Sequence, residues 1–378
     1  MNEGKMNFEE FTETVMDRLR DHLPDQYSGA ELRIGEFEKL NKSYTALQVV
    51  GGDQMAVPNI DLDTYFKSYQ SGTMGMDDVI RRMTEQLQDD PQFETEWLKD
   101  YGQVKDRLYV RVTDAKENES LLSKVPHREV DGLAVTYHIA FETPDGKSAS
   151  VPVNTSLMKM YGISEDQLHA DALASSQKLY PATFISLAEM MGNMMGVDAD
   201  TVMPTMDEPQ LMVLTNERTF QGAGALFYPG QMEAIAAQMG SDYFVLPSSI
   251  HEVLLLPDDG TIDADVLNFM IQDINMSTVA PEERLANEAY HYDTKDHVLE
   301  KASTFAIRME RKEFEKEKAA EKAAKDAPEE GKKTEPQKHR EASKKERKSV
   351  LARLSDKKDK LNSQPKRDTP LKTREAAI

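Results

Sequence analysis

The sequence predicts an α+β fold, with a mixed α/β body of short β-hairpins and a central sheet covered by helices, followed by a charged helical and disordered C-terminal tail. Two observations lead to this class. Some segments space apolar residues three and four positions apart, as in an amphipathic helix, while others alternate apolar and polar residues, as in a half-buried strand. Beyond Phe305 the composition changes to Glu, Lys, Arg and Ala, which offer too little apolar surface for a core.

Four helices are expected in the first third of the chain, at residues 7–23, 61–70, 76–88 and 93–113. The first carries a stripe of Phe, Val and Leu side chains and is closed by Pro24. Between the first two helices, residues 30–37 and 43–50 have alternating apolar character and are joined by a short polar link. This pattern predicts a β-hairpin.

The middle of the chain predicts a second hairpin and then a mixture of helices and strands. Residues 133–141 and 148–153 are the hairpin strands, joined by a Pro-Asp-Gly turn. Ser164 and Gln167 have the spacing of a capping box, which predicts that the next helix begins there. Further helices are expected at 183–195 and 230–239, and strands at 210–214, 225–228 and 243–246.

The apolar residues Val253–Leu256 are expected to form a buried strand. The Asp-Asp-Gly stretch that follows is similar to the middle of a calcium loop, with Gly260 at the sharp turn. That alignment would put Val266 where a bidentate glutamate is required, so we reject it. Asp263 is instead expected to be the N-cap of a helix over residues 264–275.

We expect the chain to consist of a folded body and a charged tail. The globular α/β body spans residues 1–305, with a candidate sub-boundary near residues 101–130. Residues 306–327 are expected to form a charged solvated helix or coiled coil, because Glu and Lys lie three or four positions apart. Residues 328–378 contain no aromatic residue and are expected to be a disordered basic tail.

Charge and composition limit the classes of function. Residues 1–300 carry 22 Lys and Arg against 52 Asp and Glu, whereas residues 301–378 carry 24 against 15. The acidic body repels phosphate backbones and anionic lipid, so we expect no membrane partner and leave nucleic-acid contact to the basic tail alone. The absence of cysteine excludes thiolate catalysis and cysteine-based zinc sites. Without an apolar N-terminal segment or an apolar run near the roughly 18 residues of a membrane helix, the protein is expected to be cytoplasmic.

One polar cluster, Ser248, Ser249, His251 and Glu252, raises the question of catalysis. A serine nucleophile needs an imidazole nitrogen roughly 2.6–3.2 Å away and a third group that orients the ring. In a strand, Ser249 and His251 share a face but lie roughly 6.6 Å apart, and Glu252 points to the other face. We therefore interpret the cluster as the lead-in to a buried strand, with hydroxyls bonded to backbone groups. Catalysis by either serine with His251 is the alternative.

Four other patterns also receive structural interpretations. Residues 291–297 hold His and Asp without the spacing of a metal site, so we expect a solvated polar loop. Gly222-Ala-Gly224 lacks the third glycine of a dinucleotide fingerprint and predicts a turn or a close backbone approach. The four methionines at 190, 191, 194 and 195 could form an adaptable binding surface, but core filling is the commoner use. His138 is expected to be hydrogen-bonded and partly buried. We expect no cofactor and no metal.

Three long stretches, together with the opening MNFEEF, resemble a known family. They are LLSKVPHREVDGLAVTYHI at 121–139, LMVLTNERTFQGAGALFYPGQMEAIA at 211–236 and DYFVLPSSIHEVLLLPDD at 242–259. The chain is similar to family five-six-eight-eight of the domains of unknown function, found in gut Firmicutes and often on conjugative mobile elements. The resemblance covers most of residues 6–300. It implies a cytoplasmic bacterial protein with a mixed α/β body and a natural start at Met6, and it supplies no activity and no site residues.

The leading hypothesis is a non-enzymatic accessory module of a mobile element. Its acidic body would hold an unknown protein partner while its basic tail tethers a second one. A serine-hydrolase-like enzyme that uses Ser248 or Ser249 with His251 is the first alternative. Nucleic-acid contact through the basic tail is the second. The sequence does not decide whether the protein is an enzyme, and its motifs favour a non-enzymatic role.

Overall fold

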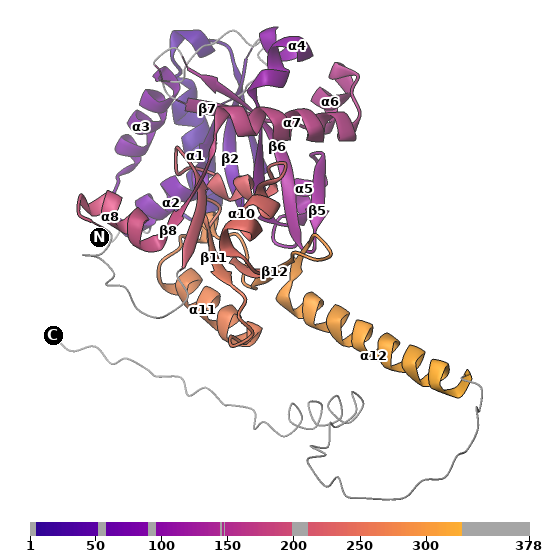
Figure 1. The fold of residues 1–378 in the computed structure, drawn as a ribbon. Coiled ribbons are helices and arrows are strands. Elements are labelled where there is room, and N and C mark those ends of the chain that lie inside the picture. The colour runs from indigo at the N-terminus through magenta and orange to yellow at the C-terminus, as the bar shows by residue number, and fades with distance from the viewer. Residues whose placement is uncertain are drawn as a thin grey trace, which may run out of the picture. The chain divides into compact units, whose positions relative to one another are not determined.

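The computed structural model describes residues 5–51, 58–89, 96–143, 146, 148–198 and 211–326. These residues combine α-helices with three antiparallel sheets, which confirms the predicted α+β class (Figure 1). The chain divides into two compact units, Met1–Ala302 and Ser303–Ile378, and all three of these sheets belong to the first unit. Among the helices described, none is long and apolar enough to cross a membrane.

The first sheet and the N-terminal helices form a core of their own. The strands are β1 (Glu31–Lys39), β2 (Lys42–Val50) and β3 (Asn59–Asp61), in that order. The helical segments are α1 (Phe8–Arg20), η1 (Asp25–Tyr27), α2 (Leu62–Ser71) and α3 (Met76–Gln88). Asn7 begins α1 in a complete capping box with Glu10. Phe11 of α1, Leu47 of β2 and Val79 of α3 belong to one buried cluster. The predicted first hairpin and the first three helices are confirmed.

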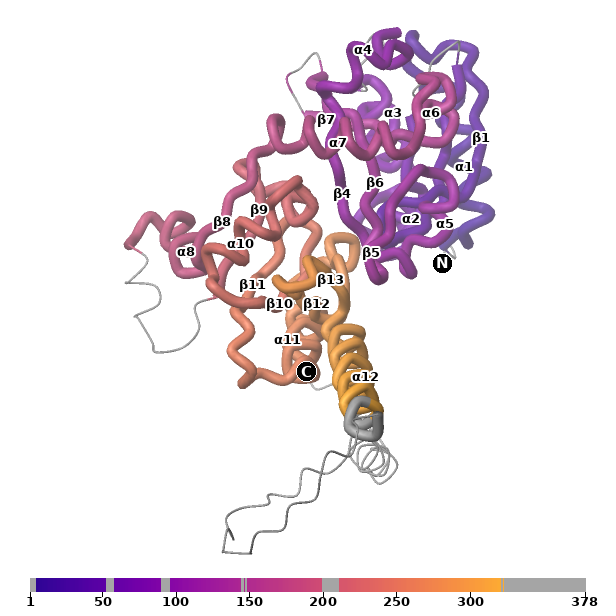
Figure 2. Tube along the Cα trace, turned by 45° about the vertical axis from the view of Figure 1, so that its right-hand side comes forward, coloured from indigo at the N-terminus to yellow at the C-terminus, as the bar shows by residue number. Residues whose placement is uncertain are grey.

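The second sheet has β6 at its centre, with β4 on one side and β5 and β7 on the other. Its strands are β4 (Leu108–Asp114), β5 (His127–Val130), β6 (Leu133–Glu142) and β7 (Ser148–Pro152). The predicted hairpin of residues 133–141 with 148–153 is therefore confirmed. Helix α7 (Glu165–Leu179) packs against β4, where the Ser176 hydroxyl accepts a hydrogen bond from the Val110 N–H at 3.0 Å (Figure 2).

The helix expected over residues 93–113 is wrong. From Leu108 the chain is strand β4, which is preceded by the short segments η2 (Glu96–Lys99), α4 (Tyr101–Val104) and η3 (Lys105–Arg107). Val110 and Val112 of β4 pair with Tyr137 and Val135 of β6. β-Branched side chains pack well on such a pleated surface, and this tertiary pairing outweighs the helical spacing of the apolar residues.

The third sheet has the strand order β13-β12-β10-β11-β9-β8. Its strands are β8 (Ala182–Ser186), β9 (Met212–Asn216), β10 (Tyr243–Leu246), β11 (Val253–Pro257), β12 (Tyr290–Asp293) and β13 (Val298–Lys301). The remaining helical segments among the described residues of the first unit are α5 (Glu119–Leu122), α6 (Thr155–Tyr161), α8 (Leu187–Met195), η4 (Gly222–Phe227), α10 (Gln231–Met239), α11 (Ala264–Ser277) and η5 (Pro281–Glu283). The predicted strand at 253–256 and the Asp263 N-cap are confirmed.

Three further predictions in this sheet are corrected. The helix expected at 183–195 begins only at Leu187, because the residues before it pair with β9 as strand β8. The strand expected at 225–228 is the 3₁₀ segment η4 instead. The polar loop expected at 291–297 begins as strand β12, whose side chains are all buried. Tyr290 and Tyr292 belong to the main core cluster, and the ring of His291 packs against that of Phe244. His291 is fully buried there, and its Nε2 lies 2.9 Å from Asp258 Oδ2.

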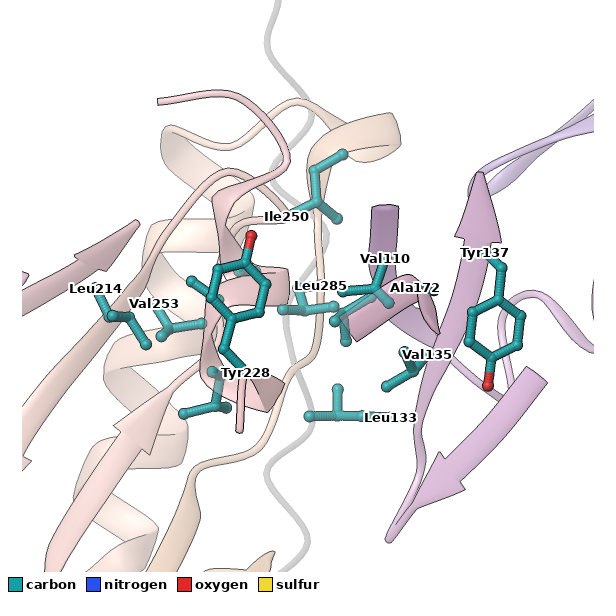
Figure 3. Close-up of a cluster of buried hydrophobic side chains, with 14 of the residues drawn as sticks. Val110, Leu133, Val135, Tyr137, Ala172, Leu214, Tyr228, Ile250, Val253 and Leu285 are labelled. Carbon is teal, nitrogen blue, oxygen red and sulfur yellow. The ribbon is translucent and has the colours of Figure 1, made fainter. Parts of the chain in front are cut away.

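The main hydrophobic core joins the second and third sheets. Figure 3 shows Val110 and Val135 of the second sheet on one side of this core and Leu214 and Val253 of the third sheet on the other, with Ile250 above them. Because both sheets contribute buried side chains, the loops between their strands are held against one another. This packing positions the polar segment around Ser249.

The described part of the second unit is nearly all helix. Helix α12 (Ala302–Asp326) carries charged residues along most of its length, and the guanidinium of Arg311 pairs with Glu315 one turn later (3.1 Å). The predicted disordered tail at 328–378 lies outside the described residues.

Candidate functional site

The polar cluster singled out in the sequence forms the loop between β10 and β11. Ser248 and Ser249 are 7% and 5% exposed. The Ser249 hydroxyl accepts a hydrogen bond from the backbone N–H of His251 (3.0 Å), and Ser249 also forms an isolated β-bridge with Arg284. The loop hydroxyl thus closes a local turn, as a strand lead-in would require.

The imidazole of His251 takes its contacts from other parts of the chain. Its Nδ1 accepts a hydrogen bond from the backbone N–H of Gln221 (3.2 Å), so the ring proton lies on Nε2. Nε2 is 3.4 Å from the carboxylate of Glu283, and the ring lies 5.4 Å from that of Phe220. Both nitrogens therefore face groups other than a serine hydroxyl, and no hydrogen bond joins the ring to Ser249 among the described residues.

The glycine pair beside this loop confirms the predicted close backbone approach. A Cβ on Gly222 would lie 2.2 Å from the Thr215 hydroxyl and 2.5 Å from the carbonyl of His251. On Gly224 it would lie 3.0 Å from the carbonyl of Val110. The missing side chains let η4 fit between the two sheets, and this fixes the backbone of Gln221 against the His251 ring.

Two cavities meet at this loop and share His251 and Glu283 as lining residues. The first, here called the methionine cavity, has a volume of about 560 Å³. It is lined by Ile185, Met190, Asn193, Met194, Thr219, Ser249, His251, Glu252, Thr278, Val279 and Glu283. Three of the four residues singled out in the sequence, Ser249, His251 and Glu252, therefore line one cavity. Ser248 is not among its lining residues.

The second cavity, here called the Arg111 cavity, has a volume of about 450 Å³. One polar wall is formed by the second sheet, and the other walls come from the β1–β2 turn, α5 and the residues before β5, η5, and the loops beside β9 and β11. It is lined by Lys39, Leu40, Arg111, Leu121, Val125, Thr136, Tyr137, His138, Ser150, Pro152, Phe220, Gln221, Ile250, His251, Glu282 and Glu283.

The methionines of α8 do not fill the core, so that prediction is wrong. Met194 is 79% exposed and Met195 58% exposed. The helix packs on its sheet through the small residues Ala188 and Gly192, and its neighbour β8 is the edge strand. Among the described residues, the methionine face therefore points away from the core, beside the methionine cavity.

The chain matches the model of a family of unknown function (DUF5688) over residues 8–294. It belongs to that family. The match covers the body and both cavities, which agrees with the resemblance seen in the sequence. No curated protein and no solved structure matches the chain.

In this DUF5688 member, the stretch that is similar to a calcium loop forms a turn. The Asp258 and Asp259 carboxylates accept hydrogen bonds from the backbone N–H groups of Gly260 and Thr261, as expected for a turn. Among the described residues, no group of three or more His, Asp or Glu side chains could hold a metal ion.

Sequence reasoning missed Arg111, Gln221 and Glu283 as residues of the site. They come from β4, from the residue before η4, and from η5, which are far apart in the chain. Of the three, only Arg111 could have been found from the sequence. It is a charged residue among the apolar residues of LYVRVTD, and this pattern indicates a strand with one polar face.

Proposed function

We propose that this chain is a non-enzymatic binding module that holds a basic, amphipathic segment of a partner protein at the methionine cavity. The observation that carries the proposal is the exposed methionine face of α8 beside a cavity that also carries two carboxylates. Met190 and Met194 line the cavity together with Glu252 and Glu283. Methionine is flexible and polarizable and suits surfaces that adapt to apolar side chains of a partner. An accessory role in a mobile element stays a prediction from the family resemblance.

The charge of the body supports a basic partner. Residues 1–300 carry 52 acidic and 22 basic side chains, so a segment rich in Lys and Arg is attracted to the body and an acidic one is repelled. Apolar side chains of such a segment would enter the cavity, while its basic side chains would lie near Glu252 and Glu283. This is the helix-in-groove mode of peptide recognition.

The hydrogen bonds favour binding over hydrolysis. The Ser249 hydroxyl is occupied by the backbone of His251, and the imidazole faces Gln221 and Glu283. A serine nucleophile would need the imidazole to leave Gln221 and Glu283 and turn toward the hydroxyl before proton transfer could begin. Labelling with a fluorophosphonate probe tests this alternative, because an adduct at Ser248 or Ser249 would contradict a purely binding role.

Peptide binding can be tested with a fluorescent synthetic helix of about 18 residues that has Leu on one face and Lys on the other. We expect the full-length protein to bind it in fluorescence anisotropy, and to bind poorly a version with Glu in place of Lys or a scrambled version of equal composition. The substitution Met194→Glu should weaken binding about tenfold or more, because it places a charge on the apolar surface.

The matched control is Phe269→Glu on α11, since Phe269 is 71% exposed and does not line the methionine cavity. It should leave peptide affinity unchanged. If both variants lose the same peptide affinity, the peptide is attracted to the protein without a defined site. If the scrambled peptide binds as tightly as the amphipathic one, charge alone attracts the peptide. Either result would overturn the proposal.

A further inference from the structure

The exposed apolar side chains of α8 are methionines, and an oxidant converts methionine from an apolar side chain into a polar one. Met194 is 79% exposed, and Met191 and Met195 are also exposed. Met190 is half-buried and lines the methionine cavity together with Met194. In Figures 1 and 2, α8 lies beside β8, the edge strand of the third sheet. The methionine surface is therefore open to small molecules from solution.

The sulfur of this chain is all in methionine. The sequence contains 21 methionines and no cysteine, so a peroxide that reacts with sulfur in this chain must react with methionine. Exposure then selects among the methionines. Met83 is fully buried in the N-terminal core, whereas three of the four methionines of α8 are exposed. We therefore expect peroxide to reach α8 before it reaches the core.

The packing of α8 tolerates a change at its methionines. Ala188 and Gly192 are the buried residues of the helix, through which it packs on β8 and β9. The Ser186 hydroxyl caps the start of the helix by accepting a hydrogen bond from the Glu189 N–H (3.1 Å). None of these contacts uses a methionine sulfur. Oxidation would therefore change the surface of α8 and leave its packing intact.

We propose that Met190 and Met194 are a reversible oxidation site, at which hydrogen peroxide forms methionine sulfoxide and thereby releases the partner from the methionine cavity. The proposal rests on the function proposed above, in which this cavity holds a basic, amphipathic segment of a partner protein. It adds a chemical control of that binding, because the two side chains that react are two of the side chains that line the cavity.

The reaction needs only the thioether and the peroxide. A lone pair of the sulfur attacks one peroxide oxygen, and an S–O bond forms as the O–O bond breaks. The hydroxide that leaves takes the proton of the transferred oxygen and becomes water, so sulfur loses the two electrons that the peroxide gains. Methionine sulfoxide reductases reverse the change, because two thiols of the reductant give up two electrons, form a disulfide and release the oxygen as water.

A sulfoxide weakens binding because its oxygen is a strong hydrogen-bond acceptor. Water hydrates this oxygen in the free protein, whereas the apolar face of a bound segment offers it no donor. Burial of a polar group without a partner is unfavourable. The basic side chains of the segment are attracted instead to Glu252 and Glu283, which line the same cavity. We expect oxidation of both methionines to weaken binding about tenfold or more.

The test uses the full-length protein and the synthetic Leu and Lys helix described above, which contains no methionine. The protein is treated with hydrogen peroxide, catalase removes the excess, and tandem mass spectrometry locates the sulfoxides. Fluorescence anisotropy should show the loss of affinity, and the two stereospecific methionine sulfoxide reductases, with dithiothreitol as reductant, should restore it. A sulfoxide at Met194 without loss of affinity, or a loss that reduction does not restore, would overturn the proposal.

Two double variants show whether the cavity methionines are responsible. Met190→Leu with Met194→Leu keeps the surface apolar without a sulfur atom, so its affinity after peroxide treatment should equal its own affinity before treatment. The matched control is Met270→Leu with Met276→Leu on α11, because both side chains are exposed and neither lines the methionine cavity. The control should lose as much affinity as the parent. If the cavity variant also loses that much, other methionines are responsible and the proposal is wrong.

A third double variant, Met190→Gln with Met194→Gln, tests the polarity of the surface without an oxidant. Glutamine is polar and similar in length to methionine sulfoxide, so this variant should bind the helix as weakly as the oxidised parent does. Its melting temperature should show that it remains folded. Binding as tight as that of the untreated parent would contradict the proposal. If the untreated parent itself does not bind the helix, the proposed function is wrong, and this inference falls with it.

Discussion

His138 is a neutral histidine on the polar face of the second sheet. Its neighbours along β6 are core residues, yet its own side chain lies on the polar face with Thr136 and Arg111. The residue is only partly buried, but its Nδ1 atom is fully enclosed. Burial and the Arg111 cation both disfavour its protonated form, so the folded state holds a neutral ring at neutral pH.

This shift predicts a pH dependence of stability. Because the pKa of His138 is lower in the folded state, the unfolded chain takes up a proton first as the pH falls below the ordinary value of 6.5. The free energy of unfolding should therefore decrease, by up to about 1.4 kcal/mol per pH unit, until the folded-state pKa is reached. In urea denaturation at pH 7.5 and 5.5, His138→Phe should lose less stability than the parent. Equal losses in both proteins would show that His138 is not responsible.

At the scale of elements, strand β11 links the local loop to the core. Leu255 is fully buried and pairs with Val245 of β10 and Met212 of β9. The Ser249 hydroxyl, four residues before the strand, accepts a local hydrogen bond from the His251 N–H. The strand and its lead-in should therefore contribute very differently to stability.

We expect Leu255→Ala to lower the free energy of unfolding by about 2–5 kcal/mol, because it leaves a cavity in the central sheet. Ser249→Ala should cost about 0.5–2 kcal/mol, the range for one lost local hydrogen bond. Chemical denaturation of both variants measures the difference. A Ser249→Ala protein as unstable as Leu255→Ala would show that the loop has a larger structural role than its single hydrogen bond indicates.

At the scale of the whole molecule, charge and core are distributed unequally along the chain. The described buried clusters end at Ala302, and the acidic majority lies in residues 1–300. Beyond Phe305 the sequence offers little apolar surface. A compact unit with its own cores should fold without the segment that follows it.

We therefore expect a fragment of residues 1–305 to fold with the melting temperature of the full chain. Limited proteolysis of the full chain should leave a resistant product that ends near residue 305, because the sequence of the charged segment that follows has too few apolar residues to build a core. Mass spectrometry of the product locates its end. A resistant product that includes residues 340–378 would disprove this boundary.

The sequence by itself determined the elements whose signals lie within a few residues. The helix start at Ser164, the hairpin of residues 30–50, the strand Val253–Leu256 and the N-cap at Asp263 all follow from local spacing and side-chain chemistry, and the structure confirms them. Ser249, His251 and Glu252 were grouped because they are neighbours in the chain, and the structure shows that they line one cavity.

Only the tertiary structure decided the elements and contacts that depend on distant partners. Residues 108–114 became a strand because β6 pairs with them, and His291 was buried because its ring packs against Phe244 of β10 and contacts Asp258. The methionines of α8 were left exposed because Ala188 and Gly192 make the packing face. Arg111, Gln221 and His251 likewise line one cavity only because strand pairing and close backbone approach bring their segments together. Local spacing carries no information about such contacts, since their energies come from residues far away in the chain.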